Sequence, residues 1–264
     1  MSELAFGLLG SGEFEPWAAE VDRWLLDHAR TGSGRVLVVP VASAPEGDEV
    51  FDGWAQRGLA HYAALGVTAE VVPIKTREDA DRRAYADAID DASVVFFSGG
   101  NPAYLAAALR ETRFLEALLD GMDRGLAYGG CSAGVACLPE LAPDSAAELG
   151  HELWRPGLGI FRGAMVAPHW DALDRYVPGL RDVVLRSVPT GCRLIGLDER
   201  TAMLGDGRTW SLVGSGGVHV FLDGAWEHHV VGGIVRLPLL PSTAEATRGA
   251  GARSTPPGEK EQHR

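Results

Sequence analysis

Residues 126–134 read Leu-Ala-Tyr-Gly-Gly-Cys-Ser-Ala-Gly, and this stretch says more about the fold than any other. A short apolar run ends in two glycines and continues as Gly130-Cys131-Ser132-Ala133-Gly134, a G-x-S-x-G pattern. The pattern predicts a nucleophile elbow, in which a tight turn between a strand and a helix holds the serine in strained backbone geometry. Ser132 is therefore the predicted nucleophile. An ordinary glycine-rich turn is the alternative, because the five residues alone are a weak signal.

Apolar runs alternate with segments of helical periodicity along most of the chain. Such alternation with short loops predicts an α/β fold, namely a doubly wound, mainly parallel sheet with helices on both faces. The predicted strands are Leu4–Leu9, Val36–Val41, Ala69–Ile74, Ser93–Phe97, Leu126–Gly129 and Ala164–Ala167, and the predicted helices are Trp17–Ala29, Glu49–Leu65, Arg77–Ile89 and Ala103–Met122.

The alternation of strands and helices ends near Leu194, where short predicted strands follow one another without helices between them. Asp223-Gly224 predicts a hairpin turn, since this pair is favoured where both central residues need positive φ. We expect an antiparallel C-terminal extension of the sheet within a single domain of residues 1–240. Residues 241–264 are rich in Pro, Gly and charge and are expected to form a disordered tail.

Composition excludes several classes of protein. The net charge of −12 argues against a nucleic-acid binder or a protein of anionic membranes, because both need a basic surface. No apolar run approaches the roughly 20 residues that span a bilayer, and the N-terminus does not resemble a signal peptide. The three cysteines have no metal-ligand spacing, which favours reduced thiols in a cytoplasmic protein.

No cofactor or metal site is expected. The loop Gly10–Phe14 suggests a dinucleotide-binding turn, but the third glycine of G-x-G-x-x-G would fall at Glu15. No Walker motif and no cluster of metal ligands is present in the sequence.

A serine nucleophile needs a base and donors for the oxyanion. His169 is the predicted base because it follows the strand Ala164–Ala167, at the sheet edge where Ser132 also emerges; His219 is the next candidate. The Ala133 N–H, at a helix start, and the Ser98–Pro102 loop are the predicted sources of oxyanion donors. The loop also reads as a tight turn with Asn101 capping the following helix.

The motifs together resemble the serine peptidase family of Asp-specific dipeptidase E and cyanophycinase. These proteins look like class I glutamine amidotransferase domains in which serine replaces the usual cysteine. The resemblance extends over roughly residues 4–235 and is carried by Leu8–Phe14, Phe97–Asn101, Tyr128–Gly134, Pro168-His169 and Gly196–Ala202.

The resemblance assigns roles to particular residues. It implies that Ser132 is the nucleophile, His169 the base, and Gly100 and Ala133 the oxyanion donors. The family's acid falls between the nucleophile and the histidine, where Glu148 is favoured over two competing carboxylates. These competitors are Asp144 and Glu152, whereas Asp198 and Glu199 belong to the downstream motif and are expected only to shape the pocket.

Cys131 offers a competing nucleophile. Shifting the frame by one residue gives Gly129-Gly130-Cys131-Ser132-Ala133, which resembles the cysteine elbow of the amidotransferases. The shifted frame lacks the closing glycine, so serine is favoured.

The expected activity is hydrolysis of a peptide or related amide bond, near an aspartyl residue, through an acyl-enzyme on Ser132. The predicted partner is a small peptide substrate, and the sequence leaves a homodimer open. The family's preference for acidic residues suggests that an arginine reads a substrate carboxylate, with Arg155, Arg162 and Arg200 as candidates. The alternative is a non-catalytic binding protein on the same scaffold.

Overall fold

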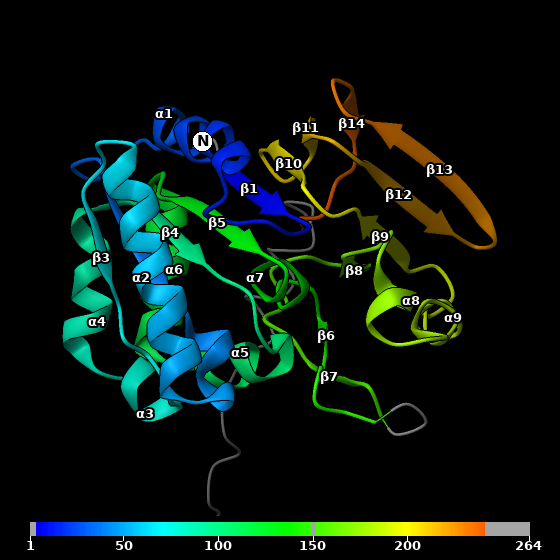
Figure 1. Cartoon of the computed structure of the whole chain (residues 1–264), viewed down its shortest axis with the longest axis horizontal. Helices are drawn as coiled ribbons and strands as arrows, with labels where there is room; N and C mark the ends of the chain where they lie inside the picture. Colours follow the sequence, from blue (N-terminus) through cyan, green and yellow to red (C-terminus); the bar gives the residue numbers. More distant parts are fainter. Residues whose placement is uncertain (1–3, 149–151, 241–264) are drawn as a thin grey trace, which may run out of the picture.

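The computed structural model describes residues 4–148 and 152–240, and its main element is an eight-stranded sheet (Figure 1). Five strands pair in parallel: β1 (Phe6–Leu9), β5 (Ala127–Cys131), β4 (Ala92–Phe97), β2 (Arg35–Val39) and β3 (Ala69–Val71). On the other side of β1, the antiparallel strands are β10 (Thr201–Gly205), β11 (Thr209–Gly214) and β14 (Ile234–Arg236). The predicted fold class is confirmed.

The two faces of this sheet bury different residues because side chains alternate along each strand. Val36 and Val38 of β2 pack with helices α1 (Ala19–His28) and α2 (Asp48–Ala64). Leu37 and Val39 point to the other face and pack with α5 (Pro102–Leu109) and α6 (Arg113–Arg124). Near-continuous apolar strands are expected for a sheet covered on both faces.

A second sheet holds part of the predicted C-terminal extension. Its order is β13 (Ala225–Val230), β12 (Gly217–Leu222), β9 (Arg193–Leu197) and β8 (Ala164–Pro168), with β8 and β9 parallel. The sequence predicts one sheet, and this detail is wrong. Glycines at the junction of β11 and β12, beginning with Gly214 at the end of β11 with a φ of 107°, let the chain leave the first sheet and enter the second.

Short elements border the second sheet. Helices α8 (Leu173–Tyr176) and α9 (Leu180–Arg186) follow β8, and their residues share a core with Trp170 and Leu194. The strands β6 (Leu141–Pro143) and β7 (Trp154–Pro156) form a separate antiparallel pair.

Two predicted helices are interrupted. Residues 77–89 contain α3 (Arg77–Ala80), α4 (Arg83–Asp87) and the start of a 3₁₀ helix, Ala88–Asp91. Residues 103–122 are divided between α5 and α6 because Glu111 has a φ of 56° and the Thr112 hydroxyl caps α6 at the Leu115 N–H. The apolar periodicity continues across both breaks, so it does not reveal them.

The hairpin prediction at Asp223-Gly224 is confirmed, with φ values of 47° and 88°. No helix within residues 4–148 and 152–240 is long and apolar enough to cross a membrane. The predicted tail, residues 241–264, lies outside the described part of the chain.

Candidate active site

Ser132 stands at a sharp turn between β5 and the short helix α7 (Ala133–Ala136). Its φ of 51° and ψ of −105° are strained for a residue with a side chain. A Cβ on Gly130 would stand 2.5 Å from the Gly134 carbonyl oxygen, and one on Gly134 would stand 2.5 Å from that of Phe97. The G-x-S-x-G glycines are therefore required by close backbone approach.

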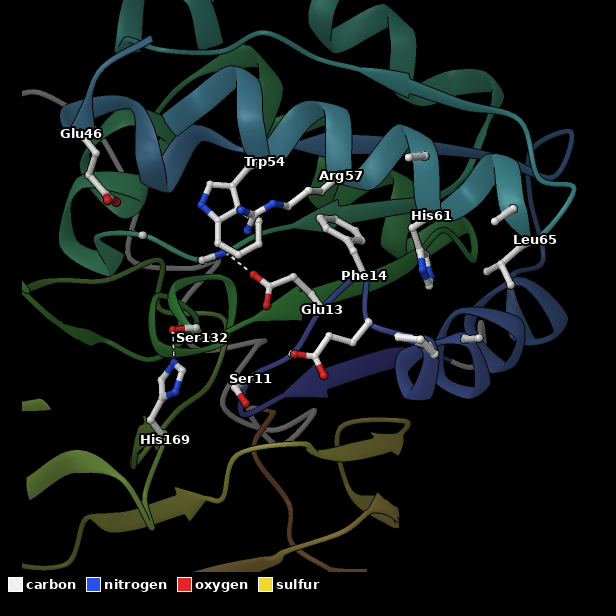
Figure 2. Close-up of a pocket in the computed structure, with 18 residues that line it drawn as sticks. Ser11, Glu13, Phe14, Glu46, Trp54, Arg57, His61, Leu65, Ser132 and His169 are labelled. Atoms are coloured by element: carbon white, nitrogen blue, oxygen red, sulfur yellow. Dashed lines mark hydrogen bonds between the residues drawn. The ribbon is translucent and has the colours of Figure 1, made fainter. Parts of the chain in front are cut away.

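The Ser132 hydroxyl is hydrogen-bonded to His169. Its Oγ lies 2.9 Å from His169 Nε2, and His169 Nδ1 lies 3.0 Å from Glu199 Oε1 (Figure 2 shows the first contact). His169 directly follows β8 and has a φ of 54°. Ser132 and His169 therefore both have a positive φ, which is uncommon for residues with a side chain. The chain of contacts has the geometry of a serine, a base and an orienting acid.

Glu199 is itself held by several neighbours. Its carboxylate accepts hydrogen bonds from Tyr176 Oη at 2.7 Å and Arg175 at 3.1 Å, and its N–H donates to Asp171 at 2.8 Å. Burial alone would raise the pKa of Glu199. The hydrogen bonds from His169 and Tyr176, with the charges of His169 and Arg175, hold it below its usual value.

The carboxylate that contacts His169 is therefore that of Glu199, whereas the sequence led us to expect Glu148 at this position. The reason lies in the second sheet, where β8 and β9 are parallel and Pro168 is paired with Leu197. Chain segments that leave the same edge of a parallel pair meet there, so His169 and Glu199 come together. Glu148 is exposed, immediately before residues 149–151.

The other carboxylates considered from the sequence have different partners. Asp144 accepts a hydrogen bond from Asn101 Nδ2 at 2.8 Å, and Glu152 pairs with Arg155 at 3.2 Å. Asp198 accepts from the Gly217 N–H at 2.9 Å and lies 3.0 Å from His219. His219, the second candidate base, therefore faces Asp198.

Cys131 is fully buried beside Ser132. Burial, the largest cause, and the neighbouring Glu13 carboxylate raise the pKa of its thiol well above the usual 9.0. A reactive cysteine needs the opposite environment, exposed and electropositive, so that the thiolate forms. These observations favour the serine frame of the turn.

The loop after β4 lies against Ser132. A Cβ on Gly99 would stand 3.6 Å from Ser132 Cβ, and the Gly99 N–H donates to Glu13 Oε1 at 2.8 Å. Gly100 has a φ of 138° and sits so close to Ala42 that a Cβ would stand 2.3 Å from its carbonyl oxygen. The Asn101 side chain accepts from Ala103 and Tyr104, which confirms the predicted cap of α5.

Ala133 is the first residue of α7, where backbone N–H groups have no partner within the helix. Gly100 lines the same cavity as Ser132. The N–H groups of Ala133 and Gly100 therefore stay the predicted oxyanion donors.

A cavity of about 1030 Å³ opens in front of Ser132. Its walls include Phe14 and Trp54, and Arg57 stacks over the Trp54 ring at 5.0 Å (Figure 2). The carboxylates lining it are Glu13, Glu15 and Glu46. Glu13 was given no role of its own from the sequence, because neither the dinucleotide motif nor the family resemblance in this loop depends on that side chain.

The three arginines proposed from the sequence do not line this cavity. Arg155 pairs with Glu152 at 3.2 Å, Arg162 with Glu140 at 2.6 Å, and Arg200 with Glu15 at 2.9 Å. Within the described residues, no group of three or more His, Cys, Asp or Glu side chains is arranged to hold a metal ion.

Comparison with known proteins bears on the identity of this site. The family model for peptidase family S51 matches residues 6–213. A peptidase from an acI-B1 actinobacterium is 28% identical, with 90% of this chain and 99% of that chain covered at a TM-score of 0.81. A peptidase E candidate from Listeria monocytogenes EGD-e is 16% identical, with coverages of 80% and 98% and a TM-score of 0.58, and it supports the fold alone.

A comparison with curated protein sequences gave no match. The family model nevertheless covers most of the chain, including the Ser132 turn, His169 and Glu199. The chain therefore belongs to peptidase family S51 and is a serine peptidase.

Proposed function

We propose that the chain hydrolyses a peptide or related amide bond, close to an aspartyl residue, with Ser132, His169 and Glu199 as its catalytic triad. The observation that carries the proposal is the unbroken contact from Ser132 Oγ through His169 to Glu199, at 2.9 and 3.0 Å. The turn Gly130–Gly134 is the nucleophile elbow of this proposal.

The proposed reaction begins when His169 Nε2 takes the Ser132 proton and Oγ attacks the scissile carbonyl. Glu199 accepts the Nδ1–H, which selects the tautomer with a free Nε2 and stabilises the imidazolium that forms. The Gly100 and Ala133 N–H groups stabilise the oxyanion. His169 then protonates the leaving amine, and water releases the acyl group by the same steps.

The aspartyl preference rests on the family resemblance and on one feature of the cavity. Arg57 is the only Lys or Arg among the described residues that line the cavity. Its guanidinium is oriented by the Trp54 ring at 5.0 Å, which leaves its N–H groups available to a carboxylate. We therefore assign recognition of the substrate carboxylate to Arg57, in place of the three arginines proposed from the sequence.

A substrate panel tests this function. Aspartyl dipeptides, matched dipeptides with Asn or Ala in place of Asp, and a β-aspartyl polymer are incubated with the wild type and with Ser132→Ala. We expect the wild type to release product fastest from an aspartyl substrate, and Ser132→Ala to release none above background. Equal rates on Asp and Asn substrates would refute the aspartyl preference. Undiminished turnover by Ser132→Ala would refute the serine mechanism.

A further inference from the structure

Two histidines outside the catalytic cavity face each other across the hairpin of β12 and β13 (Figure 1). His219 and His228 are direct partners in the strand pairing, so their side chains lie on the same face of the four-stranded sheet. Their Nδ1 atoms lie 2.8 Å apart, and the two rings are inclined at 75° with their centroids 5.0 Å apart. The proposed mechanism uses neither histidine.

The second ring nitrogen of His219 is fixed by a carboxylate. His219 Nε2 lies 3.0 Å from each carboxylate oxygen of Asp198. An ionised carboxylate only accepts hydrogen bonds, so in neutral His219 the proton is on Nε2 and Nδ1 presents a lone pair. Histidines that bind metal ions characteristically donate their other ring N–H to a carboxylate in this way. Asp198 therefore holds His219 in the tautomer of a metal ligand.

The ring of His228 is oriented by tryptophan side chains. The Trp226 ring is parallel to it within 6°, with the centroids 5.9 Å apart, and Trp226 in turn contacts the Trp170 ring at 5.5 Å. Both histidines line a cavity of about 510 Å³ on the surface of the four-stranded sheet. Water can therefore reach a metal ion that is bound between the two Nδ1 atoms.

The charges around this cavity suit a cation. Asp171 and Asp198 contribute two carboxylates, and Arg181 is the one guanidinium among the described residues that line it. Arg181 is stacked over the Trp170 ring at 5.0 Å and lies 3.9 Å from the carboxylate of Asp174, which partly offsets its charge. The two carboxylates of the cavity therefore outweigh its single positive charge.

The distance between the two Nδ1 atoms favours one class of metal ion. Metal–imidazole bonds of about 2.0–2.1 Å place their nitrogens about 2.9 Å apart when they meet at a right angle, and about 3.3 Å apart in a tetrahedral site. The observed 2.8 Å fits the right angle. Square-planar or tetragonal sites of this kind are typical of Cu²⁺ and Ni²⁺, whereas structural Zn²⁺ sites are tetrahedral.

We propose that His219 and His228 bind a divalent copper or nickel ion through their Nδ1 atoms. The hydrogen that the two Nδ1 atoms share in their hydrogen bond moves to His228 Nε2 when the ion binds. Two protein ligands leave the remaining coordination positions to water from the cavity. Sequence reasoning expects no metal site, because only the hairpin register brings these two residues, nine positions apart, into contact. This inference is independent of the proposed function.

Calorimetric titration of the tag-free protein with Cu²⁺ and with Ni²⁺ tests the site in the wild type, His228→Gln and His229→Gln. His229 is the matched control, because it is the next residue of β13 and its side chain points to the opposite face of the sheet. We expect the wild type and His229→Gln to share a strong binding step that His228→Gln lacks. Mg²⁺, which prefers oxygen ligands, should not bind the wild type at the same concentration.

Asp198→Asn tests the role of the carboxylate behind His219. The amide group facing His219 Nε2 can donate a hydrogen bond, which favours the tautomer with the proton on Nδ1 and so blocks the metal ligand. Loss of such a partner typically lowers metal affinity by about 10–100-fold, and we expect the Kd for Cu²⁺ to rise by this factor. The Asn oxygen can still accept the Gly217 N–H that Asp198 accepts at 2.9 Å, and circular dichroism checks that the fold is retained.

Electron paramagnetic resonance of the Cu²⁺-loaded wild type gives a second readout, which identifies the ligands directly. A tetragonal spectrum with two imidazole nitrogens is expected for the wild type and His229→Gln, and this spectrum should be absent in His228→Gln. The same Kd in the wild type and His228→Gln would overturn the inference, because the ion would then bind elsewhere. A wild-type spectrum without two nitrogen ligands would overturn it as well.

Discussion

The hydroxyl of Tyr128 donates a hydrogen bond of 2.6 Å to the carbonyl of Gly134, which joins strand β5 to helix α7 beneath the Ser132 turn. Tyr128 is fully buried, and burial, the largest cause, raises its pKa well above 10.0, so the hydroxyl remains a donor. The strained conformation of Ser132 is therefore supported from the interior of the domain.

Tyr128→Phe should destabilise the protein, because the buried Gly134 carbonyl loses its donor. An unsatisfied buried group costs about 1–3 kcal/mol, which corresponds to a Tm lower by roughly 2–10 °C in a domain of this size. Tyr104→Phe is the control, since it removes a less buried hydroxyl that bonds the Lys75 carbonyl at 2.8 Å. Thermal denaturation of both variants checks the prediction, and a smaller loss for Tyr128→Phe than for Tyr104→Phe would contradict it.

Ser132→Ala and His169→Ala should each lower kcat by about 10⁴–10⁶-fold, and the double variant should be little worse than either. The two side chains act as one unit in proton transfer, so their losses should not add. Steady-state kinetics on an aspartyl dipeptide measures this, with circular dichroism as the check on folding. Additive losses would mean that His169 contributes only to substrate binding.

Glu199→Gln should lower kcat by about two to four orders of magnitude while the fold is retained. The amide keeps the size of the side chain but no longer stabilises the imidazolium or selects its tautomer. Glu148→Gln is the matched control and should keep nearly wild-type kinetics, because His169 Nδ1 contacts Glu199. A large loss in Glu148→Gln with little effect in Glu199→Gln would restore the assignment made from the sequence.

The lowered pKa of Glu199 also has a consequence for stability. Its usual value is 4.5, and the folded protein holds it lower, so the ionised carboxylate stabilises the folded state above pH 4.5. This stabilisation should be lost as pH falls through the folded-state pKa. Urea denaturation of the wild type and Glu199→Gln between pH 6 and pH 3 should show their difference shrinking toward the acid end. A constant difference would refute the linkage.

The native enzyme should resist thiol alkylation at its buried cysteines. Burial raises the pKa of Cys137 to about 12, and Cys131 is shifted upward as well, so neither forms appreciable thiolate at pH 8. Iodoacetamide should therefore modify only the partly exposed Cys192 and leave peptidase activity unchanged. Peptide mapping by mass spectrometry gives the modified positions. Loss of activity in parallel with labelling of Cys131 would support Cys131 as the nucleophile in place of Ser132.

The sequence predicted the parts of the site that depend on local chain geometry. The glycines around Ser132 belong to a turn that spans five residues, so the motif contains the information for the turn. His169 lies within hydrogen-bond distance of Ser132, as expected, although its strand β8 belongs to the other sheet and not to the sheet of β5. Asp223-Gly224 was assigned correctly for the same local reason.

The places of Glu199 beside His169 and of Glu13 in the cavity wall depend on contacts between segments far apart in the chain. The sequence alone does not show these contacts, so neither place was predicted. Glu199 reaches His169 only because β9 pairs beside β8, and the division into two sheets is not visible in apolar runs. Glu13 faces Ser132 because β1 and β5 are neighbours in parallel register, with Leu9 paired to Cys131. The pairing brings the two strand ends together although their residues are far apart in the chain.

The three residues in hydrogen-bond contact at the candidate active site come from two different sheets. Ser132 ends a strand of the eight-stranded sheet, whereas His169 and Glu199 follow strands of the four-stranded one. The distance between the proposed nucleophile, Ser132, and the proposed base, His169, consequently depends on how the two sheets pack against each other. A rotation of the four-stranded sheet against the eight-stranded one would therefore separate Ser132 from His169 while leaving every strand intact.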